Sequence, residues 1–180
     1  MRVIIDGWAG SGKSTVARAV AERFKLRHVS AGDKFRVVAR RLGFSTNGEG
    51  FLEFSEYQRT HPSVDKAIDE LIIKDLRRGN CVVDSRIAGR LFKGRAYRVL
   101  LRVPDLVAAE RNALREGVSK AEALRAVVKR NKADIARYEQ LYGIDFSDLS
   151  VYDLVLDTSH FSIKDMNAVV LFVLSKALGE

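Results

Sequence analysis

Apolar positions along the chain follow two patterns: short unbroken runs, and longer stretches in which they recur every three or four residues. The short runs have the length of buried strands and lie at residues 2–6, 27–29, 80–84, 97–103 and 152–157. The longer stretches predict helices over residues 14–24, 30–42, 51–60, 63–78, 105–116, 119–141 and 163–178. Strands that alternate with helices indicate an α/β fold. We therefore expect a single domain, residues 1–180, with a five-stranded parallel sheet and helices on both faces.

Two stretches contain consecutive helices with no strand between them. They are residues 30–79 and 105–145. In an α/β domain, such helical insertions are candidates for lobes that close over bound ligands.

A glycine-rich segment follows the first apolar run and leads directly into a predicted helix. It comprises Gly7, Trp8, Ala9, Gly10, Ser11, Gly12, Lys13, Ser14 and Thr15. The glycines allow a tight turn whose N–H groups approach phosphate oxygens, and the helix directs its positive end at the same anion. Lys13 can contact the β- and γ-phosphates, and Ser14 offers a hydroxyl to Mg²⁺. The segment therefore predicts a P-loop that binds ATP with Mg²⁺.

Charge and composition narrow the possible partners. The net charge is +8, from 31 basic and 23 acidic residues, which favours a phosphate-rich partner such as RNA or two nucleotides bound together. Because no RNA-binding motif is present, we expect no stable nucleic-acid partner. No apolar run is long enough to cross a membrane and no signal peptide is evident, so a cytoplasmic location is expected. The single cysteine, Cys81, excludes an intrachain disulfide.

Two further segments are candidates for binding a second ligand. Ser30, Gly32 and Arg36 open a predicted helix, where they can bind a phosphate, although Ser30 with Asp33 also fits a capping box. Asp84 and Arg86 follow the third apolar run, and ligands of open α/β sheets bind at the carboxyl ends of strands. We expect Asp84 to hold Mg²⁺ through water or to orient the acceptor, and Arg86 to bind the acceptor phosphate.

Basic residues also share faces of the two helices predicted within 105–145. Arg111 and Arg115 share one face of the first helix, and Arg130, Asp134 and Arg137 share a face of the second. Each set by itself is typical of a solvated helix face with ion pairs. Beside a P-loop, the same arginines predict a lid that brings positive charge onto a transferring phosphoryl group.

Asp134 and Arg137 have a second interpretation as readers of a base. A carboxylate can accept from the exocyclic amino group of cytosine, while a guanidinium donates to its ring acceptors. Their i, i+3 spacing also fits a simple salt bridge, and spacing alone favours that interpretation.

Taken in order, these motifs resemble cytidylate kinases, in particular the short archaeal form, over nearly the whole chain. The resemblance is carried by residues 7–15, 30–36, 84–89, 110–115, 130–138, 142–145 and 152–159. It implies transfer of the γ-phosphoryl group of ATP to CMP or dCMP with Mg²⁺, by a monomer. It also implies that residues 30–79 form the monophosphate-binding lobe and residues 105–145 the lid.

The resemblance assigns roles by position. Ser30, Gly32 and Arg36 would line the monophosphate site with Asp84, and Arg86 would hold the acceptor phosphate. Asp134 and Arg137 would read the cytosine. The lid arginines at the transfer centre would be Arg111, Arg115 and Arg130. The segment with Thr158 and Ser159 would face the adenine, largely through its backbone.

The sequence departs from this family at two places. Trp8 occupies a P-loop position where a small residue is usual. Residues 69–72 read Asp-Glu-Leu-Ile where relatives often carry basic residues near the acceptor phosphate. Lys66 and Lys74 are candidate substitutes from neighbouring turns; if neither substitutes, a weaker affinity for CMP or a different acceptor is expected.

Two other functions remain compatible with the motifs. A P-loop kinase for another nucleotide or a small metabolite would use the same phosphate site with a different lobe. A basic P-loop domain could instead bind RNA and use ATP as a switch.

Overall fold

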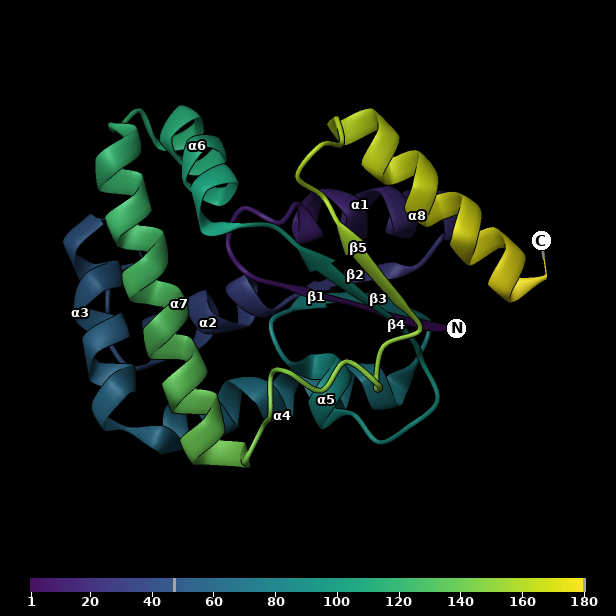
Figure 1. The fold of residues 1–180 in the computed structure, drawn as a ribbon. Helices are drawn as coiled ribbons and strands as arrows, with labels where there is room; N and C mark the ends of the chain where they lie inside the picture. Colours follow the sequence, from purple (N-terminus) through teal and green to yellow (C-terminus); the bar gives the residue numbers. More distant parts are fainter. Residues whose placement is uncertain (47, 180) are drawn as a thin grey trace.

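The computed structural model of the chain describes residues 1–46 and 48–179. The centre of this described part is a sheet of five parallel strands in the order β2-β3-β1-β4-β5 (Figure 1). The strands are β1 (Arg2–Gly7), β2 (Arg27–Ser30), β3 (Cys81–Ser85), β4 (Tyr97–Arg102) and β5 (Leu154–Asp157). They coincide with the apolar runs of the sequence, and successive strands are connected through helices, so the predicted α/β class is confirmed.

Helices cover both faces of the sheet, as predicted. In chain order they are α1 (Lys13–Phe24), α2 (Ala31–Arg41), α3 (Gly48–Thr60), α4 (Pro62–Arg78), α5 (Ala88–Leu91), α6 (Asp105–Glu116), α7 (Lys120–Tyr142) and α8 (Ile163–Leu178). Helices α1 and α8 pack on one face, and α2, α4 and α5 pack on the other (Figure 1). The sequence did not predict α5, because four residues are too few for a helical spacing to appear.

Strand β1 shows why the parallel strands are continuously apolar. Ile4 packs into the core beneath α4, with Ile72 as one neighbour in that cluster. Val3 and Ile5 face the opposite core, formed with α1 and α8. All three β1 side chains are fully buried, because each face of the sheet is covered by helices.

The first helical insertion extends the core that contains Ile4 of β1, and the second has a core of its own. Between β2 and β3, the fully buried ring of Phe54 on α3 lies 4.6 Å from Phe35 and 5.3 Å from Phe44, measured between ring centroids. Between β4 and β5, α6 and α7 pack through small side chains that include Ala109 and Ala123. The inserted segments therefore fold as helical layers at the ends of the strands, where they can cover a ligand.

The carboxyl ends of the central strands meet at one edge of the sheet. Ile5 pairs with Asp84, Asp6 with Ser85, and Ser30 with Asp84 in the strand register. The P-loop and both insertions leave the sheet from this edge (Figure 1). It is therefore the edge at which an open α/β sheet binds its ligands.

Two local expectations were wrong. Ser30 occupies the N-cap position of α2, but its side chain makes no capping hydrogen bond, and Asp33 pairs with Arg36 instead of completing a capping box. Strand β5 begins at Leu154 and not at residue 152. The hydroxyl of Tyr152 donates to Asp6 Oδ2 at 2.9 Å, so this side chain contacts β1 ahead of the first residue of β5.

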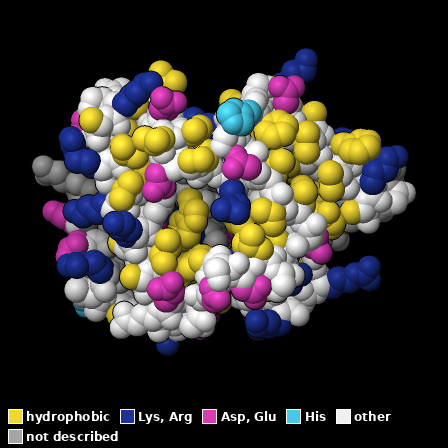
Figure 2. All heavy atoms as spheres, viewed as in Figure 1, with side chains coloured by type: hydrophobic (Ala, Val, Ile, Leu, Met, Phe, Trp, Pro, Cys, Tyr) yellow, Lys and Arg dark blue, Asp and Glu magenta, His cyan; other side chains and the backbone are white. Residues whose placement is uncertain are grey.

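Part of the surface drawn in Figure 2 is apolar. Figure 2 shows hydrophobic side chains gathered over β5 and α8, where Val155, Ile163 and Phe172 are exposed. Among the described residues, no helix combines the length and the apolar character that crossing a membrane requires. Cys81 is buried in β3, so its thiol is shielded.

Candidate active site

The P-loop joins β1 to α1 in the conformation that its glycines permit. Gly10 and Gly12 have φ angles of 78° and 89°, a region that side-chain-bearing residues rarely adopt. A Cβ at Gly7 would lie 2.6 Å from the carbonyl oxygen of Leu101, so this position requires close backbone packing. Gly12 is the N-cap of α1, whose free N–H groups and positive end face the loop. The predicted strand–loop–helix context of the motif is confirmed.

Lys13 is held within this loop. Its Nζ donates to the carbonyl oxygen of Trp8 at 3.2 Å. Burial lowers the pKa of the Lys13 ammonium to about 8, and the positive charge of Arg86 acts in the same direction. An anionic ligand beside Lys13 would relieve this repulsion, as expected of a phosphate-binding lysine.

Asp84 forms the most suitable site for a divalent cation. Its buried carboxylate is hydrogen-bonded by Ser14, and His28 Nε2 lies 2.9 Å from Oδ2. Burial would raise the pKa of Asp84, but these hydrogen bonds and the charge of Lys13 hold it below its ordinary value. Among the described residues no group of three or more potential metal ligands occurs. A single ionised carboxylate beside a hydroxyl fits Mg²⁺, which retains several waters and takes its other oxygens from phosphates.

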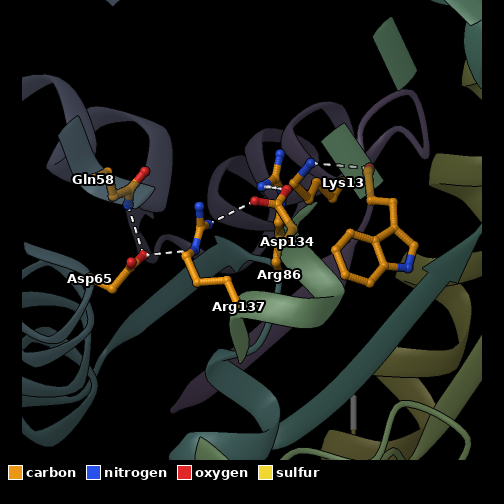
Figure 3. Close-up of polar contacts among 7 residues, drawn as sticks. Lys13, Gln58, Asp65, Arg86, Asp134 and Arg137 are labelled. Atoms are coloured by element: carbon orange, nitrogen blue, oxygen red, sulfur yellow. Dashed lines mark hydrogen bonds and ion pairs between the residues drawn. The ribbon is translucent and has the colours of Figure 1, made fainter. Parts of the chain in front are cut away.

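Arg86, Asp134 and Arg137 form a buried ion-pair chain beside Lys13 (Figure 3). Arg86 Nη1 donates to Asp134 Oδ2, and Arg137 Nη2 donates to Asp134 Oδ1 at 2.7 Å. Asp134 is only 4% exposed. The structure thus brings the predicted acceptor-phosphate residue of the β3 end together with the predicted base readers on α7.

The ion-pair chain continues into the insertion between β2 and β3. Arg137 Nε lies 3.3 Å from Asp65 Oδ1 on α4. The same oxygen accepts a 2.7 Å hydrogen bond from Gln58 Nε2 on α3 (Figure 3). Burial raises the pKa of Asp65 to about 6. This chain of polar contacts crosses from the core of the domain through α7 to α4 and α3.

Ser30, Gly32 and Arg36 lie together at the start of α2, as predicted. A Cβ at Gly32 would be 3.5 Å from Ser30 Oγ and 3.7 Å from Arg36 Nη1, so the glycine leaves space between the two side chains. Arg36 pairs with the exposed carboxylate of Asp33. Because both partners of this pair are exposed, a phosphate can compete for Arg36 at little cost.

Arg111 joins three separate segments on the other side of the P-loop. Its Nη1 donates to the carbonyl oxygen of Gly10 at 3.0 Å and to Thr158 Oγ1 at 3.1 Å, and its Nη2 donates to the carbonyl oxygen of Thr158 at 2.5 Å. Thr158 is fully buried. Arg111 on α6 therefore fixes the P-loop against the turn that follows β5.

A cavity of about 280 Å³ lies beside the first turn of the P-loop. Trp8 lines it, and the Trp8 ring packs on Phe146 with 5.2 Å between centroids. Arg86 lines the same cavity, and Figure 2 shows the surface hollowed between α7 and the end of the sheet. Trp8 thus connects the P-loop to the segment that follows α7.

Comparison with known proteins identifies the family of this chain. The model of the cytidylate kinase-like family matches residues 2–160. The chain belongs to the cytidylate kinase-like family. It is 39% identical to the cytidylate kinase of Pyrococcus horikoshii over 168 residues, which are 93% of this chain and 85% of the relative. It is 34% identical to the cytidylate kinase of Methanocaldococcus jannaschii over 174 residues, 94% of this chain and 95% of the relative.

Solved structures show that the fold of this family member is shared more widely. The shikimate kinase of Bacteroides thetaiotaomicron superposes with a TM-score of 0.62 at 15% identity, covering 100% of this chain and 99% of the other. The shikimate kinase of Aquifex aeolicus gives a TM-score of 0.56 at 20% identity, with 100% of both chains covered. At these identities the likeness shows a common P-loop kinase fold and nothing of the acceptor.

Other residues predicted for the site of a cytidylate kinase-like protein lie at varying distances from its centre. Arg130 is exposed, but the positive charge of Arg86, with partial desolvation, lowers the pKa of Arg130 to about 10, so the two guanidinium groups are close. Arg115 is not brought to the centre: its side chain is 65% exposed and pairs with Glu116 at 2.6 Å. Ser159 turns back to Asp157, to which its N–H donates at 2.8 Å.

The two lysines considered as substitutes on α4, Lys66 and Lys74, are both exposed. Asp69, in the stretch that departs from the family pattern, accepts a 2.7 Å hydrogen bond from the Tyr142 hydroxyl at the end of α7. Burial raises the pKa of Asp69 to about 7. The departure therefore supplies a contact between α4 and α7.

Sequence reasoning missed several residues of the site. Gln58, Asp65 and His28 lie in predicted elements but form no recognisable motif. The i, i+4 spacing of Asp65 and Asp69 on α4 was the available signal, because it places two carboxylates on one helix face. That signal was weak, since such a face is most often solvated.

Proposed function

We propose that this chain transfers the γ-phosphoryl group of ATP to CMP or dCMP, producing ADP with CDP or dCDP. One observation carries the proposal: the buried pair of Asp134 and Arg137 lies against Arg86, beside Lys13 of the P-loop. This arrangement places a carboxylate and a guanidinium suited to cytosine within reach of a phosphate site. Relatives named cytidylate kinases, at 34–39% identity, support the same acceptor.

The P-loop side would bind ATP. Backbone N–H groups of residues 10–15 and the Lys13 ammonium would contact the β- and γ-phosphates. Ser14 directly and Asp84 through water would hold Mg²⁺, which when bound neutralises charge on the phosphate oxygens. The segment with Thr158 and Ser159 would face the adenine.

The acceptor would bind on the other side, between α2, α4 and α7. Its phosphate would contact Arg86 together with Ser30, Gly32 and Arg36, and its base would contact Asp134 and Arg137. Arg86 would exchange the Asp134 carboxylate for the phosphate, which leaves Asp134 Oδ2 able to accept from the amino group of cytosine. Binding of the nucleotide would therefore exchange the Arg86–Asp134 ion pair for two new contacts, one from Arg86 to the phosphate and one from Asp134 to the base.

The transfer step requires positive charge around the transferring phosphoryl group and correct placement of the two substrates. An oxygen of the acceptor phosphate forms a bond to the γ-phosphorus as the bond from that phosphorus to the β–γ bridging oxygen breaks. The acceptor phosphate is already ionised at neutral pH, so no dedicated general base is required. Lys13, Arg86 and Arg130 would stabilise charge on the transferring group. Arg111 would act beside the P-loop, and Arg115 would contribute only after the lid moves.

The proposal also includes movement of the two helical insertions, and the oligomeric state and location of the protein. The insertion between β2 and β3, residues 30–79, would close over the monophosphate, and residues 105–145 would close over ATP, which would exclude water from the reaction. We also propose that the protein acts as a monomer in the cytoplasm, in pyrimidine nucleotide metabolism.

A coupled assay of ADP release tests the proposal. Wild-type protein with ATP and Mg²⁺ would be supplied in turn with CMP, dCMP, UMP, AMP and GMP, with Lys13→Ala as the control at every acceptor. We expect rapid ADP release with CMP and dCMP, and at least about a 100-fold loss of rate in the control, because Lys13 would contact the transferred group.

The outcomes separate the candidate functions. Turnover that depends on a different nucleotide or a small metabolite would retain the P-loop kinase and refute the acceptor. ADP release that no acceptor stimulates, together with salt-sensitive RNA binding, would favour an RNA-binding ATPase.

A further inference from the structure

The acceptor side of the site contains a buried carboxylate with no role in the proposed phosphate or base contacts. Asp65 is 3% exposed and lies on α4, facing α7. Its Oδ1 is shared by Gln58 Nε2 at 2.7 Å and Arg137 Nε at 3.3 Å. Asp65 is thus in direct contact with a residue assigned to the base, and it belongs to the opposite lobe.

Accepting the proposed function, we propose that Asp65, held by Gln58, is a positioning residue that orients the Arg137 guanidinium for cytosine and so helps to select CMP over UMP.

Two carboxylates contact the planar Arg137 guanidinium at different nitrogens. Asp134 Oδ1 accepts a hydrogen bond from Nη2, whereas Asp65 Oδ1 forms an ion pair with Nε at 3.3 Å that lacks hydrogen-bond geometry. The attraction of these two charges on separate edges restricts how the guanidinium can rotate. The Tyr138 ring lies 4.9 Å from the guanidinium carbon. Without Asp65, the orientation of Arg137 would depend on Asp134, which must also serve the base.

Cytosine and uracil differ at the ring position that Arg137 would contact. Cytosine has an unprotonated ring nitrogen N3 beside the O2 carbonyl, whereas uracil carries a proton on N3. A guanidinium held in the plane of the base can donate to N3 of cytosine and meets an N–H in uracil. Discrimination therefore depends on how closely the orientation of Arg137 is controlled, since a rotated guanidinium could still donate to the O2 that both bases share.

The buried position of Asp65 is unfavourable for a carboxylate. Burial raises the pKa of Asp65 to about 6, so its charged form is disfavoured where it lies. Asp65 Oδ2 has no hydrogen-bond partner within the described part of the chain. A contact that only joined α3, α4 and α7 would be served as well by a neutral amide of the same shape. The negative charge of Asp65 is explained if its role is to orient the positively charged guanidinium of Arg137.

The test is the substitution Asp65→Asn, which keeps the shape and an oxygen acceptor but removes the charge. Asp75→Asn is the matched control, because Asp75 is a buried carboxylate on the same helix, paired with Lys34 at 2.6 Å and Arg27 at 3.3 Å, away from the ion-pair chain. KM and kcat would be measured for CMP and UMP at saturating ATP, with KM for ATP and the melting temperature recorded for each variant.

We expect Asp65→Asn to raise KM for CMP about tenfold and to lower the CMP-to-UMP ratio of kcat/KM about tenfold, because one charged contact to Arg137 is weakened. KM for ATP should stay within about twofold. The melting temperature at neutral pH should not fall, because the pKa of Asp65 is raised to about 6 on folding, and ionisation of such a carboxyl destabilises the folded state. Asp75→Asn should lower the melting temperature and leave the CMP-to-UMP ratio unchanged.

A second variant covers the case in which Asp65→Asn does not fold. Gln58→Met removes the donor to Asp65 with similar volume, and it should lower the CMP-to-UMP ratio in the same direction by a smaller factor. If both variants, or the one that folds, keep the wild-type ratio within about twofold, the positioning role is refuted while the kinase assignment stands. Wild-type protein without CMP or dCMP turnover would refute the proposed function first, and this inference with it.

Discussion

Asp134 has two cationic partners in the protein, and each of its carboxylate oxygens serves one of them. Oδ2 accepts from Arg86 and Oδ1 from Arg137, whose side chains are 15% and 17% exposed. Arg130 adds a third positive charge close to Arg86. The charge of Asp134 therefore compensates a cluster of cations, in addition to the base contact proposed for it.

We predict that Asp134→Asn lowers kcat/KM for CMP by about 100-fold or more, because removing one partner of a buried charge pair costs about 2–5 kcal/mol. KM for ATP should change by less than about threefold, since the substitution leaves the P-loop intact. Steady-state kinetics with CMP and ATP varied in turn would measure both effects.

Glu139→Gln is the control for this variant, because Glu139 is exposed on the same helix. It should behave as wild type. An Asp134→Asn protein that uses CMP as well as wild type does would contradict the base-reading role.

Single residues were predicted from the sequence when a local backbone requirement identified them. Gly10 and Gly12 have the positive φ angles that a P-loop demands, and Lys13 follows them at a set spacing. Asp65 and Gln58 could not be identified in this way. Their contacts depend on how α3, α4 and α7 pack together. The position of a carboxylate within one helix does not indicate which residue of another helix it will contact.

At the scale of elements, α4 and α7 are joined by carboxylates at two points. Asp65 contacts Arg137, and Asp69 Oδ2 accepts from the Tyr142 hydroxyl at 2.7 Å. Burial raises the pKa of Asp69 to about 7, with the nearby charge of Asp65 acting in the same direction. The folded state therefore binds a proton at Asp69 more tightly than the unfolded chain does.

The consequence is a stability that depends on pH. Because the pKa of Asp69 rises from 3.8 to about 7 on folding, its ionisation reduces the free energy of unfolding as pH rises through that interval. Asp69→Asn removes this cost and keeps an oxygen that accepts from Tyr142. We predict that the variant is more stable than wild type by about 1–2 kcal/mol at pH 8 and similar to wild type near pH 4.5.

Urea unfolding of both proteins at the two pH values would measure the difference. Glu70→Gln, an exposed neighbour on the same helix, should stay within about 0.5 kcal/mol of wild type at both pH values. A loss of stability in Asp69→Asn at pH 8 would show that the ionised carboxylate stabilises the fold.

Helices and strands were largely predictable, and the exceptions have local causes. The apolar runs identified the strands because both faces of a parallel sheet are covered. The expected capping box does not form, because Asp33 pairs with Arg36 one helical turn further along α2. The short helix α5 left no periodic signal, yet Gly89 at its start donates its N–H to Asp6 Oδ2 at 2.9 Å.

At the scale of the whole molecule, the nucleotide site is assembled from segments far apart in the chain. Arg111 lies 101 residues from Gly10 and 47 from Thr158, and it donates to both. These contacts fix α6, the P-loop and the turn after β5 relative to one another. One side chain of α6 therefore holds the P-loop against the segment expected to face the adenine.

We predict that Arg111→Ala raises KM for ATP by about 10- to 100-fold, because hydrogen bonds from a charged donor contribute about 1.5–3 kcal/mol. KM for CMP should stay within about threefold, since the ion-pair chain around Asp134 does not include Arg111. Kinetics with ATP varied at saturating CMP would measure the effect.

Arg125→Ala, a loss of an exposed arginine on α7, provides the control and should leave KM for ATP unchanged. Equal changes in KM for ATP and CMP in Arg111→Ala would indicate general loosening of the fold and contradict the local role.

The sequence by itself determined the α/β class, the succession of strands and longer helices along the chain, the two helical insertions and the P-loop. These features are encoded by apolar periodicity and by local backbone requirements, which short segments express independently of their surroundings. Only the tertiary structure decided that Asp134 joins Arg86 to Arg137, that the chain of contacts extends to Asp65 and Gln58, and that Arg115 lies apart. Such pairings depend on the packing of helices from different insertions, which the spacing within any one helix does not specify.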